Sequence, residues 1–163
     1  MKDSGKLTLD DADFRILRAL SEDGRASDVV IGERVHLSSS SVARRRKVME
    51  ESGVIAGYDA RLDMAKLGFS GVVVVSIELA SQSEHVLQEF EQAVVKCPLI
   101  SYCGFVTGDT DFLILIHVSS FNDYGTIYRQ ELSILPHVSR IRSSFVLRQV
   151  ARRVNLPTIL QRR

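Results

Sequence analysis

Residues 27–55, SDVVIGERVHLSSSSVARRRKVMEESGVI, decide how the N-terminal part of this chain folds. Helical patterns at 29–35 and 41–51 flank a short turn at 36–38. The second pattern opens with serines and continues into a run of cations at 44–47. A helix, a tight turn and a second helix with hydrogen-bond donors and positive charge are typical of a helix-turn-helix that enters a DNA groove. The stretch therefore predicts a DNA-binding motif.

The residues expected to face DNA lie at the start of the second helix. Ser38 is suited to be its N-cap, because a serine hydroxyl can accept a hydrogen bond from a free amide of the first turn. The side chains that follow lie where a recognition helix meets base edges and phosphates. The predicted DNA-binding residues are Ser38, Ser39, Ser40, Ser41, Arg44, Arg45 and Lys47. The alternative interpretation is a capped surface helix with a solvated run of charge.

Two residues depart from the expected pattern of this motif. His36 stands in the turn, where a non-glycine residue has to tolerate a positive φ. Arg46 interrupts the apolar stripe that Val42 and Met49 begin and end. The stripe alone therefore leaves open the rotation of the second helix and which arginines face DNA.

A further helix is expected before the motif. Asp10 and Asp13 can cap it, and its apolar residues recur on one side. These apolar residues are Leu9, Ile16, Leu17 and Leu20. Three helices over about 8–52 thus predict a small DNA-binding head, after which Gly53 stops the last helix and 54–63 reads as an extended connecting strand.

From residue 69 onward the pattern changes to strands that alternate with helices. The run at 71–80 is rich in β-branched valine, which favours a strand, and a tight turn at 108–110 predicts a hairpin. The expected elements are strands at 71–80, 100–107, 111–118 and 138–149 and helices at 84–96 and 121–135. This β-α-β-β-α-β order predicts a ferredoxin-like sandwich, with two helices on one face of an antiparallel sheet.

The whole chain is therefore expected to be an α+β protein. Its N-terminal part is a three-helix, winged-type helix-turn-helix head, and its C-terminal part is a ferredoxin-like βαββαβ sandwich. The expected boundaries are 1–54 for the head, 55–68 for the connecting strand and linker, and 69–163 for the second domain, which ends in a basic tail.

Composition narrows the functional classes. The chain has 163 residues, 45% of them hydrophobic and 25% charged, which excludes a disordered or membrane-spanning class. Its 21 Lys and Arg balance 20 Asp and Glu, so the cations at 44–47 are a local feature. The N-terminus lacks the apolar core of a signal peptide, which predicts a cytoplasmic protein. Cys97 and Cys103 have no metal-ligand spacing, so no metal, disulfide or cofactor is expected.

The sequence resembles the Lrp/AsnC family of feast/famine transcription regulators over nearly its whole length. In the first half the resemblance is carried by Leu9, Asp10, Asp13, Ile16, Leu17, Leu20, Asp23, Gly24, Arg25, the stretch Val35-His36-Leu37-Ser38 and GVIAGY at 53–58. In the second half it is carried by VTGDTDF at 106–112 and LPHV at 135–138. His36 and His137 stand where members of the family often have glycine.

The resemblance implies a DNA-binding transcription regulator whose assembly or DNA binding responds to an amino acid or a related small molecule. It implies a homodimer that can associate further, up to an octamer, through the 69–163 domain. A free amino acid needs an anionic acceptor for its ammonium and exposed amides for its carboxylate, which the turn at 107–111 can supply. The predicted effector-binding residues are Tyr102, Gly108, Asp109, Thr110 and Asp111. The plain alternative is that the turn only closes the hairpin.

No catalytic constellation accompanies the histidines, so an enzyme is not expected. Two alternative functions remain in view. Some proteins with this two-domain plan resemble regulators but act as sirohaem decarboxylases, in which a histidine could serve the tetrapyrrole. The other is a DNA-architectural protein without an effector, which would bind DNA independently of sequence.

Overall fold

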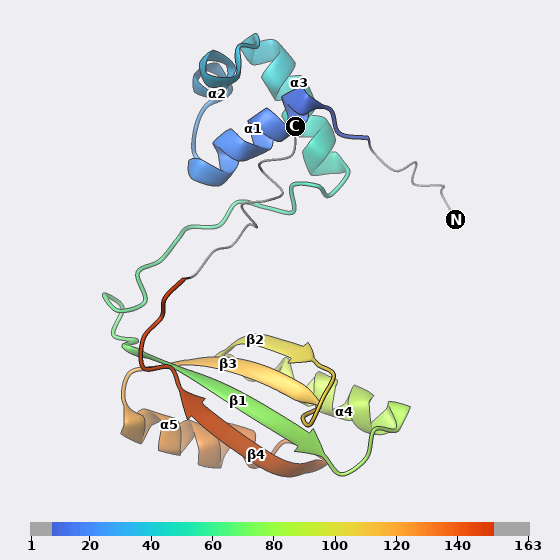
Figure 1. The fold of residues 1–163 in the computed structure, drawn as a ribbon, viewed down its shortest axis with the longest axis vertical. Coiled ribbons are helices and arrows are strands. Elements are labelled where there is room, and N and C mark those ends of the chain that lie inside the picture. Colours follow the sequence, from blue (N-terminus) through green and yellow to red (C-terminus); the bar gives the residue numbers. More distant parts are fainter. Residues whose placement is uncertain (1–7, 152–163) are drawn as a thin grey trace. The chain divides into compact units, whose positions relative to one another are not determined.

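A computed structural model describes residues 8–151 of the chain. They form two compact units, a head that ends at Arg61 and a sheet unit, Leu62–Val150 (Figure 1). The basic tail expected at the C-terminus lies outside the described residues. No helix among residues 8–151 is both long and apolar enough to span a membrane.

The head contains the three predicted helices, α1 (Asp11–Glu22), α2 (Asp28–Val35) and α3 (Ser39–Glu51). Asp10, Ser27 and Ser38 are their N-caps, and each side chain accepts a hydrogen bond from the backbone N–H three residues later. Such caps satisfy amides that a helix leaves without a partner. The short polar residues before each apolar pattern thus set where the helices begin.

One small apolar core holds the head together. Its fully buried side chains come from all three helices and include Ile16, Ile31, Val42 and Met49. Within each helix the buried residues are three, four or seven positions apart, which puts them on one face. Ile16, Val42 and Met49, which the apolar patterns of the sequence predicted, are therefore confirmed as core residues.

The turn between α2 and α3 depends on two unusual backbone positions. His36 adopts the left-handed conformation, with φ 57°, as its place in the turn predicted. A Cβ added to Gly32 would lie only 2.6 Å from the carbonyl oxygen of Leu37. Gly32 is therefore required for the close approach of the turn to α2.

We expect Gly32→Ala to destabilise the head by about 1–3 kcal/mol, because the added methyl group has to displace a backbone carbonyl rather than a flexible side chain. The control is Gly57→Ala, since a Cβ at Gly57 meets no atom within 4 Å. Chemical denaturation of both variants measures the difference. Equal stability of Gly32→Ala and wild type would contradict the close approach of the Leu37 carbonyl to Gly32.

The sheet unit has the predicted βαββαβ order. Its strands are β1 (Gly71–Leu79), β2 (Ile100–Phe105), β3 (Phe112–Val118) and β4 (Val138–Phe145). They form one antiparallel sheet in the order β2-β3-β1-β4. The helices α4 (Glu84–Val94) and α5 (Phe121–Ile127) cover one face (Figure 1). The expected α+β class and ferredoxin-like sandwich are confirmed.

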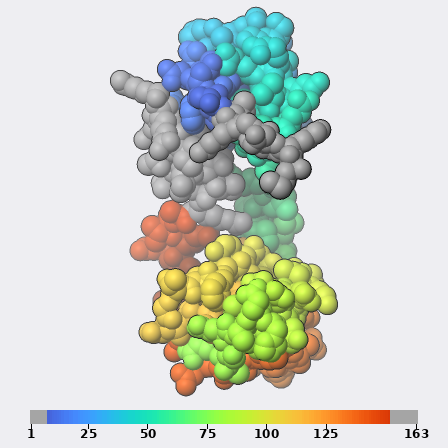
Figure 2. All heavy atoms as spheres, turned by 90° about the vertical axis from the view of Figure 1, so that its right-hand side faces the viewer, coloured from blue at the N-terminus to red at the C-terminus, as the bar shows by residue number. Residues whose placement is uncertain are grey.

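The two faces of the sheet differ because side chains alternate along each strand. Val73, Val75 and Ile77 of β1 are fully buried against the helices. The residues of the opposite face are half buried or exposed, and we call it the open sheet face. It is formed by Val72, Val74, Ser76, Glu78, Tyr102, Gly104, Leu113, Leu115, His117, Arg140, Arg142 and Ser144. In the space-filling view, α4 and β2 lie beside each other on one side of this unit (Figure 2).

Some elements differ from the sequence prediction. Residues 54–63 form no strand, since no strand of the described chain pairs with them. The helix expected at 121–135 is α5 followed by a π-helical turn, Tyr128–Leu132, because the amide of Ser133 bonds to the carbonyl of Tyr128 at 2.9 Å. The strand expected at 138–149 ends at Phe145. β2 forms an edge of the sheet.

Candidate DNA interface and effector site

The outward side of α3 is polar and carries the first part of the candidate DNA interface. Ser39, Ser40, Ala43, Arg44 and Lys47 are exposed, while Val42 and Met49 face the core. Ser38 is the N-cap, and its hydroxyl lies 3.2 Å from that of Ser40. Ser41 is half buried. Serines 39 and 40, rather than all four, therefore present hydroxyls on the outer side of α3.

Arg44 and Lys47 are the exposed cations of the run. Lys47 makes only a distant contact with Glu51, at 3.8 Å, and both side chains are more than half exposed. Such a pair one helical turn apart holds a side chain weakly. Both cations thus remain available to a phosphate or a base edge.

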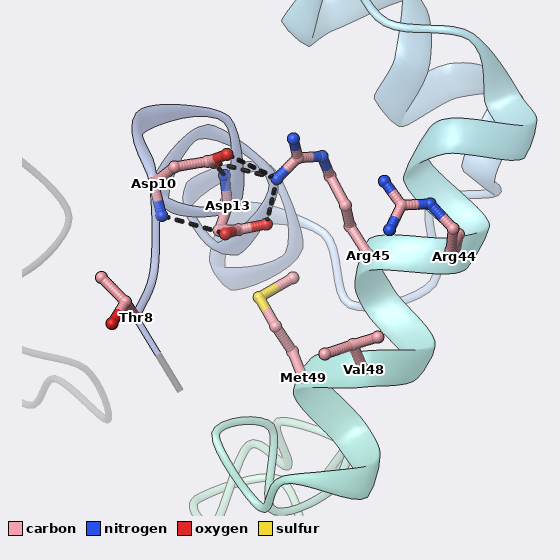
Figure 3. Close-up of a pocket in the computed structure, with 7 residues that line it drawn as sticks. All are labelled: Thr8, Asp10, Asp13, Arg44, Arg45, Val48 and Met49. Atoms are coloured by element: carbon pink, nitrogen blue, oxygen red, sulfur yellow. Dashed lines mark hydrogen bonds and ion pairs between the residues drawn. The ribbon is translucent and has the colours of Figure 1, made fainter. Parts of the chain in front are cut away.

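Arg45 is directed away from this exposed side and binds α1. Its Nη1 lies 2.8 Å from Oδ2 of Asp10 and 2.8 Å from Oδ1 of Asp13. Figure 3 shows Arg45 reaching from α3 to both carboxylates, while no interaction is drawn from Arg44. Hydrogen bonds to Asp13 and then Asp10 raise the pKa of Arg45. Arg45 therefore belongs to the packing of the head, which corrects its prediction as a DNA-facing residue.

Arg46 is also engaged within the head. It bonds to Asp28 of α2 at 3.3 Å, to Glu50 at 3.1 Å and to the hydroxyl of Tyr58 at 2.7 Å. Its guanidinium carbon stands 4.7 Å from the centre of the Tyr58 ring. This network explains why a cation interrupts the apolar stripe of α3. Of the run at 44–47, only the first and last cations face outward freely.

The predicted effector turn has a free carboxylate and a buried one. Gly108 takes φ 118°, and Asp109 is exposed. Asp111 is only 7% exposed; it accepts hydrogen bonds from the Leu79 amide at 2.7 Å and from the Gln82 side chain at 2.6 Å. Both oxygens of Asp111 are thus already used to tie the hairpin to the end of β1. The prediction that Asp111 receives a ligand ammonium is corrected.

Thr110 and Tyr102, the other two predicted effector residues, have contacts within the sheet unit. Thr110 donates its hydroxyl hydrogen to the carbonyl of Ile77 at 2.8 Å. Tyr102 lies on the open sheet face opposite Leu115 and is 53% exposed. A Cβ on Gly104 would clash with the Tyr102 hydroxyl oxygen, because the ring lies across that glycine. Tyr102 therefore lies within β2, on the open sheet face, and its ring covers Gly104.

β4 supplies charged residues at the turn that the sequence analysis missed. Nη2 of Arg142 lies 3.3 Å from the carbonyl oxygen of Asp109 and 2.6 Å from Oε1 of Glu78. Arg140 stands 3.8 Å from the other oxygen of Glu78. The carboxylate of Glu78 and the guanidinium of Arg142 therefore meet beside the turn that contains Asp109. Only the register of β4 on β1 could have revealed this.

Groups with potential for other chemistry are held in structural contacts. His137 bonds to Glu89 at 2.6 Å, and this hydrogen bond lowers the pKa of Glu89. Desolvation raises the pKa of Cys97 and raises that of Cys103 to about 11, which disfavours reactive thiolates. Within residues 8–151, no cluster of His, Cys, Asp and Glu has the makings of a metal site.

We expect Asp111→Asn to lower the free energy of unfolding by about 1–3 kcal/mol, because an amide nitrogen then has to face a donor, either the buried Leu79 amide or the Gln82 side chain. Asp109→Asn, an identical change on an exposed side chain two residues away, serves as the control. Thermal and denaturant unfolding compare the two variants. Equal stabilities would mean that the buried carboxylate is not the clamp of the hairpin.

Comparisons with known protein families match both units. Residues 9–56 match the model of a winged helix-turn-helix DNA-binding domain. Residues 72–156 match the model of the Lrp/AsnC ligand binding domain. The two matches together account for the head and the sheet unit.

Individual relatives cover nearly the full chain. The Bkd operon transcriptional regulator of Pseudomonas aeruginosa is 37% identical over 87% of this chain and 93% of its own length. The leucine-responsive regulatory protein of Rhizobium meliloti is 33% identical over 89% of this chain and 93% of its own length. A transcriptional regulator of Neisseria meningitidis, solved as a complex with L-Met, aligns with a TM-score of 0.87 at 30% identity, over 92% of this chain and 97% of that one.

Proposed function

Because the chain belongs to the Lrp/AsnC family of transcriptional regulators, we propose that α3 reads the major groove of DNA and that an amino acid controls this binding through the sheet unit. The observation that carries the proposal is the division of α3 into an engaged side and an outward side. The outward side presents Ser39, Ser40, Arg44 and Lys47.

The chemistry of these side chains suits a DNA groove. Arginine can donate two hydrogen bonds to a guanine edge, and serine can bond to any base or to a phosphate. Residues at the N-terminal end of a recognition helix are the ones that meet base edges. In this proposal Ser39, Ser40 and Arg44 read bases, and Lys47 contacts the phosphate backbone.

A second copy of the chain is the partner proposed for the open sheet face. Val74 and Leu115 lie opposite each other in the register, with Val72 and Leu113 next to them on the same face. A contiguous half-exposed apolar patch of this kind marks an interaction site. A homodimer places two heads on one duplex, so that binding of the second head gains from effective concentration. Dimers that associate further, up to an octamer, extend the same gain.

An amino acid is the effector that fits the turn between β2 and β3. Its ammonium needs a carboxylate, which Asp109 offers. Its own carboxylate needs a cation or free amides, which the half-exposed Arg142, beside its partner Glu78, and Gly108 offer. The relative solved with L-Met supports the class of ligand. The effector acts by binding one assembly state more tightly than another.

The effector proposal is tested by a thermal-shift screen of the standard amino acids, followed by DNA binding with each ligand that stabilises the protein. We expect Asp109→Asn to weaken binding of such a ligand by about 1.5–3 kcal/mol, because a charge-assisted hydrogen bond is lost. Glu91→Gln removes an exposed carboxylate from α4 and serves as the control. Calorimetry that finds equal affinity in Asp109→Asn and wild type would remove the turn from the effector site.

A further inference from the structure

We propose that Arg45 is a positioning residue for DNA recognition: by binding the two carboxylates of the α1 capping box, it sets the rotation of α3 and so the direction of Arg44. The inference rests on the proposed function, because it presupposes that α3 reads DNA. It gives Arg45 a role that acts through Arg44 rather than through contact with DNA.

The two carboxylates that Arg45 binds are themselves held in place by hydrogen bonds. Asp10 accepts a hydrogen bond from the Asp13 amide at 2.9 Å, and Asp13 accepts one from the Asp10 amide at 3.0 Å. The same two carboxylates hold Nη1 of Arg45 at 2.8–2.9 Å. The start of α1 therefore presents a preorganised pair of acceptors, and Arg45 does not have to order them on binding.

Apolar packing alone constrains the rotation of α3 weakly. Val42 and Met49 are its only buried residues, and they stand two turns apart. At the position between them Arg46 binds Asp28 of α2. α3 is thus held by Arg45 on the side of α1 and by Arg46 on the side of α2. Adjacent helix residues are fixed about 100° apart, so α3 rotates as one body. A rotation that moved Arg45 would therefore redirect Arg44 by the same angle.

The charges of Asp10 and Asp13 allow a positioning role of Arg45 to be distinguished from a direct contact of Arg45 with DNA. Asp10 and Asp13 place two negative charges beside one guanidinium, and the backbone hydrogen bond from Asp13 and the contacts of Arg45 lower the pKa of Asp10. Replacing these acids by asparagine makes the head more positive, which by electrostatics alone strengthens binding to any DNA. Loss of positioning has the opposite sign, because specific contacts are then misaligned.

The experiment compares Asp10→Asn and the double variant Asp10→Asn, Asp13→Asn in the full chain. Asparagine is as good an N-cap as aspartate, so the caps of α1 are kept. Asp11→Asn, at an exposed residue of the same turn, matches the change in charge of Asp10→Asn. Arg44→Gln tests the proposed function in parallel. The probes are a duplex that the wild type selects from a random pool and a scrambled duplex of the same length.

We expect the acid variants to bind the selected duplex about tenfold more weakly, to bind the scrambled duplex at least as well as wild type, and to keep the salt slope. Asp11→Asn should not weaken binding to the selected duplex. Tighter binding of the acid variants to the selected duplex would overturn the inference. Arg45→Gln is a further variant, for which the salt dependence of binding is measured on both duplexes. A salt slope that falls by about one unit on both would also overturn the inference, because it indicates a direct phosphate contact of Arg45. If Arg44→Gln also has no effect, the proposed function fails; if only the acid variants have no effect, this inference alone fails.

Discussion

The double variant Arg44→Ala, Lys47→Ala should lose about 10- to 100-fold in affinity for a duplex that the wild type selects, because a lost arginine–base contact costs about 1–3 kcal/mol. The lost phosphate contact adds to this and should lower the slope of log K against log salt by about one unit. These two side chains are the outward cations of α3, while Arg45 and Arg46 are bound within the head. Binding isotherms over a salt series measure both effects.

The control for this variant removes the same charge elsewhere. Lys66 and Lys96 are exposed residues of the sheet unit, and Lys66→Ala, Lys96→Ala should bind the selected duplex nearly as well as wild type. If the control loses as much affinity as the α3 variant, the effect is one of net charge. Wild-type affinity in Arg44→Ala, Lys47→Ala would mean that another surface of the head reads DNA.

Val74→Asp should convert the proposed dimer into a monomer and weaken binding to a two-site duplex by about 100-fold or more, the gain that effective concentration supplies to paired modules. A carboxylate at the centre of the open sheet face would be buried without a partner on dimerisation, which is strongly unfavourable. Light scattering gives the mass, and binding to duplexes with one or two half-sites gives the second effect.

Val95→Asp is the matched control, because Val95 is 78% exposed at the end of α4 and lies on the other face of the unit. It should leave both the mass and the DNA affinity unchanged. A Val74→Asp protein that remains dimeric, with unchanged secondary structure, would show that copies of the chain meet through another surface.

The fold was predictable because its signals are local. Caps such as Asp10 and Ser38, the four-residue spacing of Ile31 and Val35, and the valines of β1 all depend on residues near one another in the sequence. Each local preference agrees with the final packing, as expected for a sequence that specifies one structure. The left-handed His36 could also be foreseen from its place in the turn.

The partners of charged side chains were not predictable, because they depend on how distant elements pack. The run at 44–47 reads as one cationic surface, yet Arg45 binds α1 and Arg46 binds α2. Likewise, Asp109 and Asp111 lie in the same turn, and the sequence alone does not distinguish them. Asp109 is exposed, whereas Asp111 accepts hydrogen bonds from Leu79 and Gln82. The α3 rotation that separates Arg44 from Arg45 exists only in the folded head.

The central claim, that α3 enters the DNA groove in pairs, is tested most directly by affinity cleavage. Ala43 lies on the outward side of α3 next to Arg44, and Ala43→Cys can carry an iron chelate that cuts nearby DNA. The raised pKa values of Cys97 and Cys103 favour labelling at the new position. We predict two clusters of cuts on the selected duplex, separated by a whole number of helical turns of about 10 base pairs. Cuts spread evenly along the duplex, or the same cuts from a chelate at Val95→Cys, would contradict the claim.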